Sequence, residues 1–344
     1  MYTYDAAVFI GRFQPFHNGH SHVVREALKI AKEVVIVIGS ARAARNIRNP
    51  FTFEERKAMI LASFPEDMAR LKITGVPDYP YDENKWVASV QTAVMGAMSF
   101  SPDPLKITLI GHSKDNTSYY LKMFPFWDSV EAEAYMPSDS TLSATPIREA
   151  LFSNPQMTYF AKSMHPTVFA YIQDLTQRPW FSVLRKEFEM VMKYRDAWFG
   201  SPFPPTFVTV DAVVVQSGHV LLVKRKAMPG AGLWALPGGF LDQQETLLEG
   251  AIRELKEETK IKVPVPVLRG SIKRQHTFDA PNRSLRGRTI TTAFFIDLGF
   301  SAELPKVKGS DDAEVAKWVP FKDINPAQMF EDHFSILDFF TNIG

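Results

Sequence analysis

Residues 239–261 read GFLDQQETLLEGAIRELKEETKI, and this stretch decides the fold of the C-terminal part of the chain. It predicts a long helix over about residues 246–259. Glu254, Glu257 and Glu258 are three and four residues apart, so their side chains share one face of that helix. Clustered carboxylates repel one another unless divalent cations with oxygen ligands sit among them. The pattern therefore predicts a metal site; for these three residues alone, an ordinary solvated acidic helix is the alternative.

The whole stretch resembles the Nudix box, which is G, five residues, E, seven residues and then R-E-U-x-E-E-x-G-U, with U aliphatic. The residues in register are Gly239, Glu245, Arg253, Glu254, Leu255, Glu257, Glu258 and Ile261. The resemblance implies a Nudix hydrolase, an α+β fold with a mixed sheet between helices. It implies that Glu254, Glu257 and Glu258 bind Mg²⁺ or Mn²⁺ and that Glu258 is catalytic. Such a metal screens a diphosphate and activates water.

Two features inside the box carry separate expectations. Lys260 stands where the pattern has its last glycine, which normally ends the helix with a positive φ. A lysine there costs about 1 kcal/mol if the left-handed conformation is kept. Arg253 and Glu249 are four residues apart, and we expect them to pair on another part of the helix.

The segments around the box predict the rest of this domain. Residues 208–215 and 220–224 are β-branched runs that flank Ser217-Gly218, which is a hairpin signal. Further strands are predicted at residues 267–276, 289–298 and 313–319. The proline-rich stretch 200–206 forbids regular structure and predicts a linker between domains 1–199 and 207–344.

Other residues of the C-terminal part resemble the ADP-ribose pyrophosphatase branch of the Nudix hydrolases. They are LWALPGGF at 233–240, Arg283, the pair Arg286 and Arg288, and Asp332-His333. The resemblance implies that ADP-ribose is cut into AMP and ribose 5-phosphate, with Gly238, Gly239, Arg286 and Arg288 contacting it. Solvated surface arginines are the alternative for the last two. Glu314 follows a loop that supplies a general base in some members, although an ordinary acidic turn fits equally well.

Upstream of the linker, short apolar runs alternate with amphipathic stretches. Strands are predicted at residues 6–10, 34–38, 71–76, 106–110 and 130–134, and helices at 21–32, 53–64 and 84–98, with a helical cap from about 155 to 199. Thr52 and Glu55 form a capping-box pattern before the second helix. This alternation predicts an α/β domain with a doubly wound parallel sheet.

The sequence GRFQPFHNGH at residues 11–20 stands where the first strand ends and the first helix begins. Ligands of open α/β sheets bind at the carboxyl ends of strands, and a helix N-terminus there suits a phosphate. His17 and His20 add imidazole donors, Arg12 adds a guanidinium, and Gly19 permits close approach of the backbone. For the four residues HNGH alone, a turn with solvated histidines is the alternative.

The ten-residue run resembles the archaeal-type nicotinamide mononucleotide (NMN) adenylyltransferases of the nucleotidyltransferase superfamily, which have a Rossmann-like fold. The superfamily's S-x-T-x-x-R signature matches Ser143, Thr145 and Arg148. The resemblance implies that His17, His20 and Arg148 are catalytic and that Asn84 and Trp86 hold the nicotinamide. A core tryptophan is the alternative for Trp86. Implied ATP or phosphate contacts are Arg12, Phe13, Gly19, Arg56, Ser143, Thr145 and Arg148, with residues 111–115 (GHSKD) assigned loosely to the nucleotide.

The implied reaction is in-line attack of the NMN phosphate on the α-phosphorus of ATP, which gives NAD and pyrophosphate. Positioning and charge neutralisation drive such a reaction, and no nucleophilic side chain is required. Mg²⁺ or Mn²⁺ is expected with ATP, held mostly by phosphate oxygens and water.

The composition of the chain argues against several classes of function. The 39 basic and 38 acidic residues nearly balance, which argues against binding of nucleic acid or membranes through bulk charge. There are no cysteines, no signal peptide pattern and no apolar run that could span a bilayer, so we expect a cytoplasmic protein. No G-x-x-x-x-G-K-[ST] loop occurs. Two alternatives stay open, a different acceptor for the adenylyl group and a Nudix half that only senses ADP-ribose or NAD. A homo-oligomer is also left open.

Overall fold

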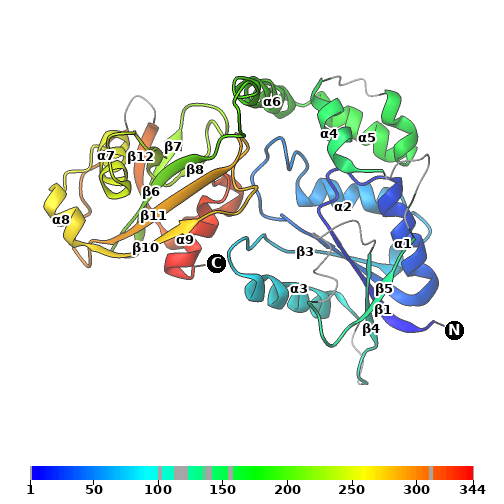
Figure 1. The fold of residues 1–344 in the computed structure, drawn as a ribbon. Helices are drawn as coiled ribbons and strands as arrows, with labels where there is room; N and C mark the ends of the chain where they lie inside the picture. The colour runs from blue at the N-terminus through cyan, green and yellow to red at the C-terminus, as the bar shows by residue number, and fades with distance from the viewer. Residues whose placement is uncertain are drawn as a thin grey trace. The chain divides into compact units, whose positions relative to one another are not determined.

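The computed structural model describes residues 2–99, 103–111, 123–133, 135, 142–153, 158–309 and 313–343. The chain divides into two compact units, Met1–Arg185 and Lys186–Gly344 (Figure 1). The division falls inside helix α6 (Pro179–Asp196), so the C-terminal part of this helix belongs to the second unit. The linker at 200–206 stays a prediction from the sequence.

The first unit is built on a five-stranded sheet in the order β3-β2-β1-β4-β5, and all its neighbouring strands are parallel. The α/β fold predicted from the alternating pattern is thus confirmed. The strand order reverses between β1 and β4, which is where open α/β sheets bind ligands. The strands are β1 (Tyr4–Gly11), β2 (Ala31–Ile38), β3 (Leu71–Gly75), β4 (Ile107–Gly111) and β5 (Asp128–Glu131).

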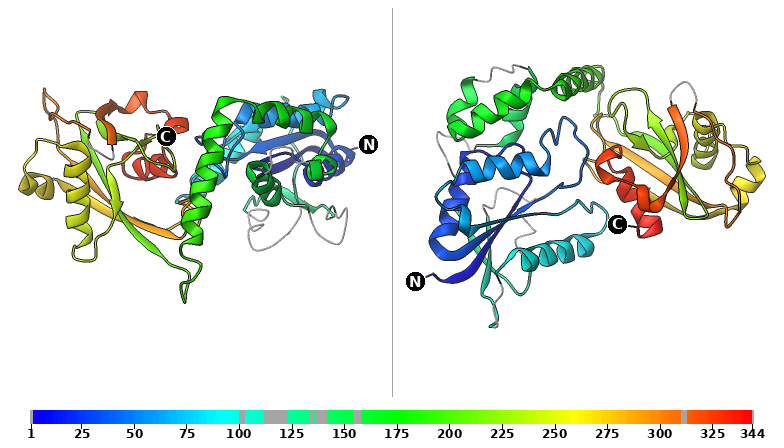
Figure 2. Two further views of the ribbon diagram at one scale, coloured as in Figure 1. Left: turned by 90° about the horizontal axis from the view of Figure 1, so that it is seen from above. Right: turned by 180° about the vertical axis from the view of Figure 1, so that it is seen from behind.

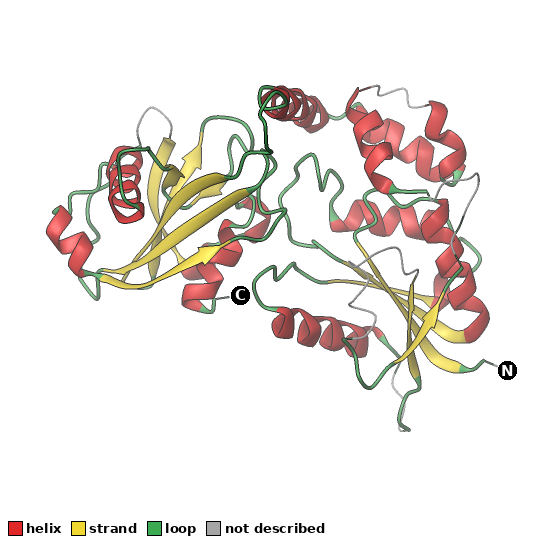
Figure 3. Cartoon of the chain, in the orientation of Figure 1, coloured by secondary structure: helices red, strands yellow, loops and turns green. Residues whose placement is uncertain are grey.

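Helices cover both faces of this sheet. The buried residues Val90 and Val94 of α3 (Glu83–Ala97) pack against Val8 and Val35 on one face. Figures 1 and 3 show α1 (Asn18–Ile30) and α2 (Phe53–Ala62) on the opposite face. The segment predicted as a helical cap, residues 155–199, contains helices α5 (Pro166–Thr176) and α6, although the C-terminal part of α6 belongs to the second unit. Helix α4 (Ala144–Ser153) precedes this segment.

The second unit has a mixed seven-stranded sheet between two helices (Figure 2). Phe294 faces the core under α7 (Leu247–Thr259), whereas its neighbour Phe295 stacks on Phe340 of α9 (His333–Thr341) with ring centroids 5.5 Å apart. The strands are β6 (Phe207–Gln216), β7 (His219–Arg225), β8 (Trp234–Ala235), β9 (Gly238–Phe240), β10 (Ile272–Phe278), β11 (Thr289–Asp297) and β12 (Ala313–Pro320).

Two local expectations for the second unit had different outcomes. The hairpin between β6 and β7 is confirmed, since Ser217 and Gly218 turn with φ values of 46° and 75°. The strand predicted from residue 267 is wrong over its first residues, which form helix α8 (Val265–Gly270). A proline in the first turn of α8 favours helix at its start, and Leu268 anchors it in the core. The strand begins only at Ile272.

Candidate active sites

The two histidines of the first unit lie together at the N-terminus of α1. His17 is the N-cap residue and His20 occupies the third helical position, with the two rings stacked at a centroid distance of 3.7 Å. The His17 backbone N–H donates to Nδ1 of His20 at 3.3 Å. In the neutral ring the proton therefore resides on Nε2 of His20, which makes that atom a hydrogen-bond donor.

Aromatic packing fixes the orientation of His20. The Phe13 ring meets it edge-on at 4.9 Å, and the Phe16 ring stacks at 5.5 Å. Both phenylalanines are 1% exposed, and Phe13 has a φ of 52°. The Phe13 side chain therefore supports the imidazole of His20, and the predicted phosphate contact of Phe13 stays a prediction. Gly19 lies beside His17, because a Cβ there would come within 3.0 Å of its Cε1.

Cationic side chains from distant segments converge near the histidines. Arg148 of α4 donates to the Gln14 backbone carbonyl at 2.8 Å and to Oγ1 of Thr145 at 3.0 Å. Burial, together with the positive charges of Arg12 and Arg48, lowers the pKa of Arg148 to about 10. Mutually repelling guanidinium groups gathered in this way favour a polyanionic ligand.

Arg56 lies beneath this group of arginines. It is 1% exposed, and its guanidinium donates to four backbone carbonyls, those of Arg12, Gly39, Ser40 and Thr52. Burial lowers its pKa to about 10. These hydrogen bonds join the start of α2 to the ends of β1 and β2, and a contact of Arg56 with a phosphate stays a prediction.

The remaining predicted residues of the first unit lie on two other helices, α4 and α3. Ser143 and Thr145 are exposed at the start of α4, where the Thr145 N–H faces Oγ of Ser143 at 3.5 Å. Asn84 is exposed in the first turn of α3. Trp86 packs against the core beneath that helix, 6.0 Å from the Phe124 ring. Residues 112–115 lie outside the described residues.

In the second unit, α7 lies tightly against β9. A Cβ at Gly239 would come within 2.7 Å of Cδ of Glu254, so the absence of a side chain makes room for that carboxylate. The Gly238 N–H donates to Oε2 of Glu258 at 3.1 Å. Gly238 thus binds one predicted metal ligand, Glu258, through its N–H, and Gly239 leaves space for another, Glu254.

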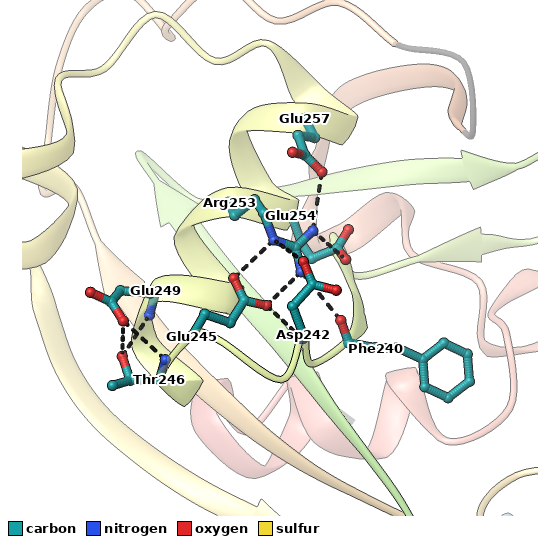
Figure 4. A network of polar contacts seen from close by, with 8 residues as sticks. All are labelled: Phe240, Asp242, Glu245, Thr246, Glu249, Arg253, Glu254 and Glu257. Carbon is teal, nitrogen blue, oxygen red and sulfur yellow. Dashed lines mark hydrogen bonds and ion pairs between the residues drawn. The ribbon is translucent and has the colours of Figure 1, made fainter.

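Arg253 is the centre of the polar network drawn in Figure 4. It donates to Glu245 at 2.9 and 2.7 Å, to Glu254 at 2.9 Å and to Glu257 at 3.1 Å. Its hydrogen bonds lower the pKa of Glu245 to about 2. The predicted Arg253–Glu249 pair is wrong, because Glu249 instead accepts from Thr246 and completes a capping box at the start of α7.

The carboxyl groups of Glu254 and Glu258 are more buried than that of Glu257. Burial raises the pKa of Glu258 to about 7 despite the Gly238 N–H, and it also raises the pKa of Glu254. Glu257 is 57% exposed. Within the described residues, no group of three or more acidic or histidine side chains is arranged to hold a metal ion. The donors nevertheless fit a hard divalent cation, since burial raises the pKa values of both Glu254 and Glu258 although the guanidinium groups of Arg253 and Arg225 lie nearby.

The predicted substrate contacts and the predicted general base of this unit are not part of the carboxylate network around Arg253. The Arg286 guanidinium lies 4.8 Å from the Phe240 ring centroid, and its buried Nε has no hydrogen-bond partner among the described residues. Arg288 is engaged with Asp279, whose carbonyl accepts from its Nη1. Glu314 falls at a register shift at the start of β12, and its side chain lies outside the description.

Three further residues near this site were missed from the sequence. Asp211 and Glu331 are buried carboxyl groups whose pKa values are raised by that burial, and Arg225 is a neighbouring charge of both Glu258 and Glu331. Asp211 accepts from Oγ1 of Thr291 at 2.6 Å. A lone carboxylate inside the apolar run 208–215 is a signal that could have drawn attention to it.

None of the helices among the described residues combines the length and apolar character that crossing a membrane requires.

Comparisons with known proteins match both units. The cytidylyltransferase-like family matches residues 8–102, and the NUDIX domain family matches residues 205–340. The nicotinamide/nicotinic acid mononucleotide adenylyltransferase of Acinetobacter baylyi is 47% identical over 44% of this chain and 78% of its own. The ADP-ribose pyrophosphatase of Methanocaldococcus jannaschii is 35% identical over 38% of this chain and 72% of its own.

Solved structures extend the similarity over the full length. The bifunctional NMN adenylyltransferase/ADP ribose pyrophosphatase of Francisella tularensis is 37% identical, with a TM-score of 0.91 over 99% of this chain and 100% of the other. A complex of the Francisella protein with AMP and a manganese ion gives 35% identity and a TM-score of 0.90, again over 99% and 100% of the two chains.

Proposed function

The chain belongs to the family of bifunctional NMN adenylyltransferase/ADP ribose pyrophosphatases, and on that premise we propose how its residues perform the two reactions. The first unit transfers AMP from ATP to NMN and releases pyrophosphate. The second unit hydrolyses ADP-ribose to AMP and ribose 5-phosphate.

The stacked histidine pair is the observation that supports the first assignment. With Nδ1 of His20 occupied by the His17 N–H, Nε2 of His20 donates to the phosphate that reacts. An oxygen of the NMN phosphate attacks the α-phosphorus of ATP, and the bond from that phosphorus to the bridging oxygen breaks. Arg12 and Arg148 neutralise the charge that develops on the leaving pyrophosphate, with Ser143 and Thr145 contacting it.

Asn84 and Trp86 are assigned to the nicotinamide of NMN, and Arg56 is a positioning residue beneath the phosphates. The Acinetobacter relative is named for both nicotinamide and nicotinic acid mononucleotide, so both acceptors are relevant to this chain.

The buried carboxylates beside Gly238 and Gly239 support the second assignment. Glu254 and Glu258 would hold Mg²⁺ or Mn²⁺ together with Glu257, and the ion would supply charge neutralisation and an activated water. Glu258 is proposed as a catalytic residue as well as a ligand of this ion. Arg286 contacts the diphosphate or the terminal ribose. Arg288 is a weaker candidate because of its contact with Asp279, and Glu314 is proposed as the general base.

Product analysis of the purified full chain tests these assignments. We expect NAD and pyrophosphate from ATP with NMN, and AMP with ribose 5-phosphate from ADP-ribose, each only with Mg²⁺ or Mn²⁺. Nicotinate mononucleotide and flavin mononucleotide serve as competing acceptors. Binding of ADP-ribose without hydrolysis would instead favour the sensor alternative, and turnover of flavin mononucleotide alone would favour the other acceptor class.

A further inference from the structure

The C-terminal part of α6 holds two loops of the second unit. Arg195 donates from both Nε and Nη2 to the backbone carbonyl of Leu285, at 3.1 and 2.7 Å. About two helical turns earlier, Oε2 of Glu187 accepts from the Gly230 N–H at 2.8 Å. A Cβ at Gly230 would collide with the Phe330 ring, so the backbone of this loop lies directly against that ring. α6 thus fastens two separate segments that precede and follow the Nudix box.

Leu285 is held from both sides. Its N–H donates to Oε1 of the half-buried Glu331 at 2.8 Å, while its carbonyl accepts from Arg195. The next residue is Arg286, whose own N–H faces Oγ of Ser284 at 3.3 Å. The backbone from which Arg286 extends is therefore fixed by one anchor inside the core and a second anchor on α6.

A second set of contacts joins the same helix to the Arg286 side chain. The Tyr194 and Trp198 rings lie 5.7 and 5.3 Å from the Phe207 ring. Phe207 in turn meets Phe240 edge-on at 5.9 Å, and the Arg286 guanidinium lies over Phe240. The α6 region therefore reaches Arg286 through its backbone and, independently, through the ring beneath its guanidinium.

We propose that Arg195 is a positioning residue of the second site, which sets the place of Arg286 by holding the Leu285 carbonyl. This role rests on the proposed contact of Arg286 with ADP-ribose. It gives a helix outside the matched Nudix segment a part in substrate binding at the Nudix site.

Steady-state kinetics of the full chain test the proposal, with Mg²⁺ and ADP-ribose as substrate. We expect Arg286→Ala to raise KM about tenfold or more, and Arg195→Ala to raise KM about tenfold with kcat within twofold. Arg195→Lys restores much of the loss, since an ammonium group still donates to one carbonyl. The double variant is no worse than Arg286→Ala, because the two residues act as one unit.

Lys193→Ala is the matched control, since it removes a positive charge from the same exposed turn of α6, and it should leave KM unchanged. Adenylyl transfer by each variant reports the first unit. If Arg286→Ala raises KM but Arg195→Ala does not, or if the two effects multiply, Arg195 does not act through Arg286. A fall in kcat alone would mark Arg195 as structural. An unchanged KM in Arg286→Ala would overturn the substrate contact itself.

Discussion

Gly239 stands where β9 and α7 come too close for any side chain. A methyl group there would meet the Glu254 carboxylate, which lies between the two elements. Gly238 is equally crowded, since its Cβ would lie 3.0 Å from Cα of Asp211. Because these two glycines have no side chains, the carboxylates of Glu254 and Asp211 can lie close to the backbone of β9.

We predict that Gly239→Ala lowers kcat/KM for ADP-ribose about 100-fold, because a displacement of about 1 Å at a reacting centre costs that much. Mn²⁺ binding, measured by titration calorimetry, should weaken in parallel. Gly270→Ala is the control, since nothing lies within 4 Å of its Cβ position. Unchanged metal affinity in Gly239→Ala would contradict the placement of Glu254 as a ligand.

His333 is expected to make the second unit sensitive to acid. Burial lowers its pKa from 6.5 to about 3, and its Nδ1 accepts from the Leu236 N–H at 3.0 Å. The folded state therefore binds fewer protons than the unfolded state between these pH values. The stabilising contribution is complete above about pH 6.5 and is lost as pH falls, by about 1.4 kcal/mol per pH unit.

Asparagine can replace the acceptor at this position without titrating. His333→Asn should accordingly flatten the dependence of the unfolding free energy on pH between 4.5 and 6.5, as measured by urea unfolding. His165→Asn in the first unit is the control. An equal slope in His333→Asn and the unaltered chain would show that this imidazole is not held neutral by the fold.

Side-chain roles were predictable from the sequence only where spacing along one element determines them. His17 and His20 fall on one helix end, and their rings stack there as their spacing allows. The burial of Arg56 and Phe13 depends on how separate segments meet, so spacing could not reveal it. Spacing could not reveal the role of Glu331 either, because the tertiary fold brings its carboxyl group near Arg286.

The α7 helix shows both the strength and the limit of reading elements from sequence. Its extent was predicted almost to the residue, although the capping box that starts it was not recognised from the sequence. The predicted Glu249–Arg253 pair was wrong because a carboxylate in the first helical turn accepts hydrogen bonds from backbone N–H groups that have no partner within the helix. Over residues 267–270, valine and leucine suggested a strand, but the preceding prolines favour a helix start.

Lys260 keeps the left-handed conformation that the pattern normally gives to glycine, with φ 48° and ψ 28°. Replacement by glycine relieves the strain but increases the entropy of the unfolded chain. We expect Lys260→Gly to raise the unfolding free energy of the second unit by about 0.5 to 1 kcal/mol.

Pulse proteolysis across a urea series measures this change for each unit separately. Lys262→Gly, two residues further on, has no such strain to relieve and should destabilise the unit. A lower stability in Lys260→Gly would mean that contacts of the lysine outweigh its backbone cost.

At the scale of the whole molecule, the chain carries two sites built from different units and opposite charges. Imidazole and guanidinium groups gather at the end of β1 in the first, and buried carboxylates gather between α7 and β9 in the second. The pairing of the two folds was predictable because each motif is long and strictly spaced. The part of α6 that belongs to the second unit was not, because helical periodicity does not reveal which unit a helix joins.

Assay of both reactions in two single variants of the full chain tests this division most directly. His20→Ala should lower adenylyl transfer about 100- to 1000-fold, the usual effect of removing one preorganised donor, and leave ADP-ribose hydrolysis within about twofold. Glu258→Gln should abolish ADP-ribose hydrolysis and leave adenylyl transfer unchanged. If either variant loses both activities while the chain stays folded, or if neither loses the activity assigned to its unit, the assignment of two separate phosphate sites is wrong.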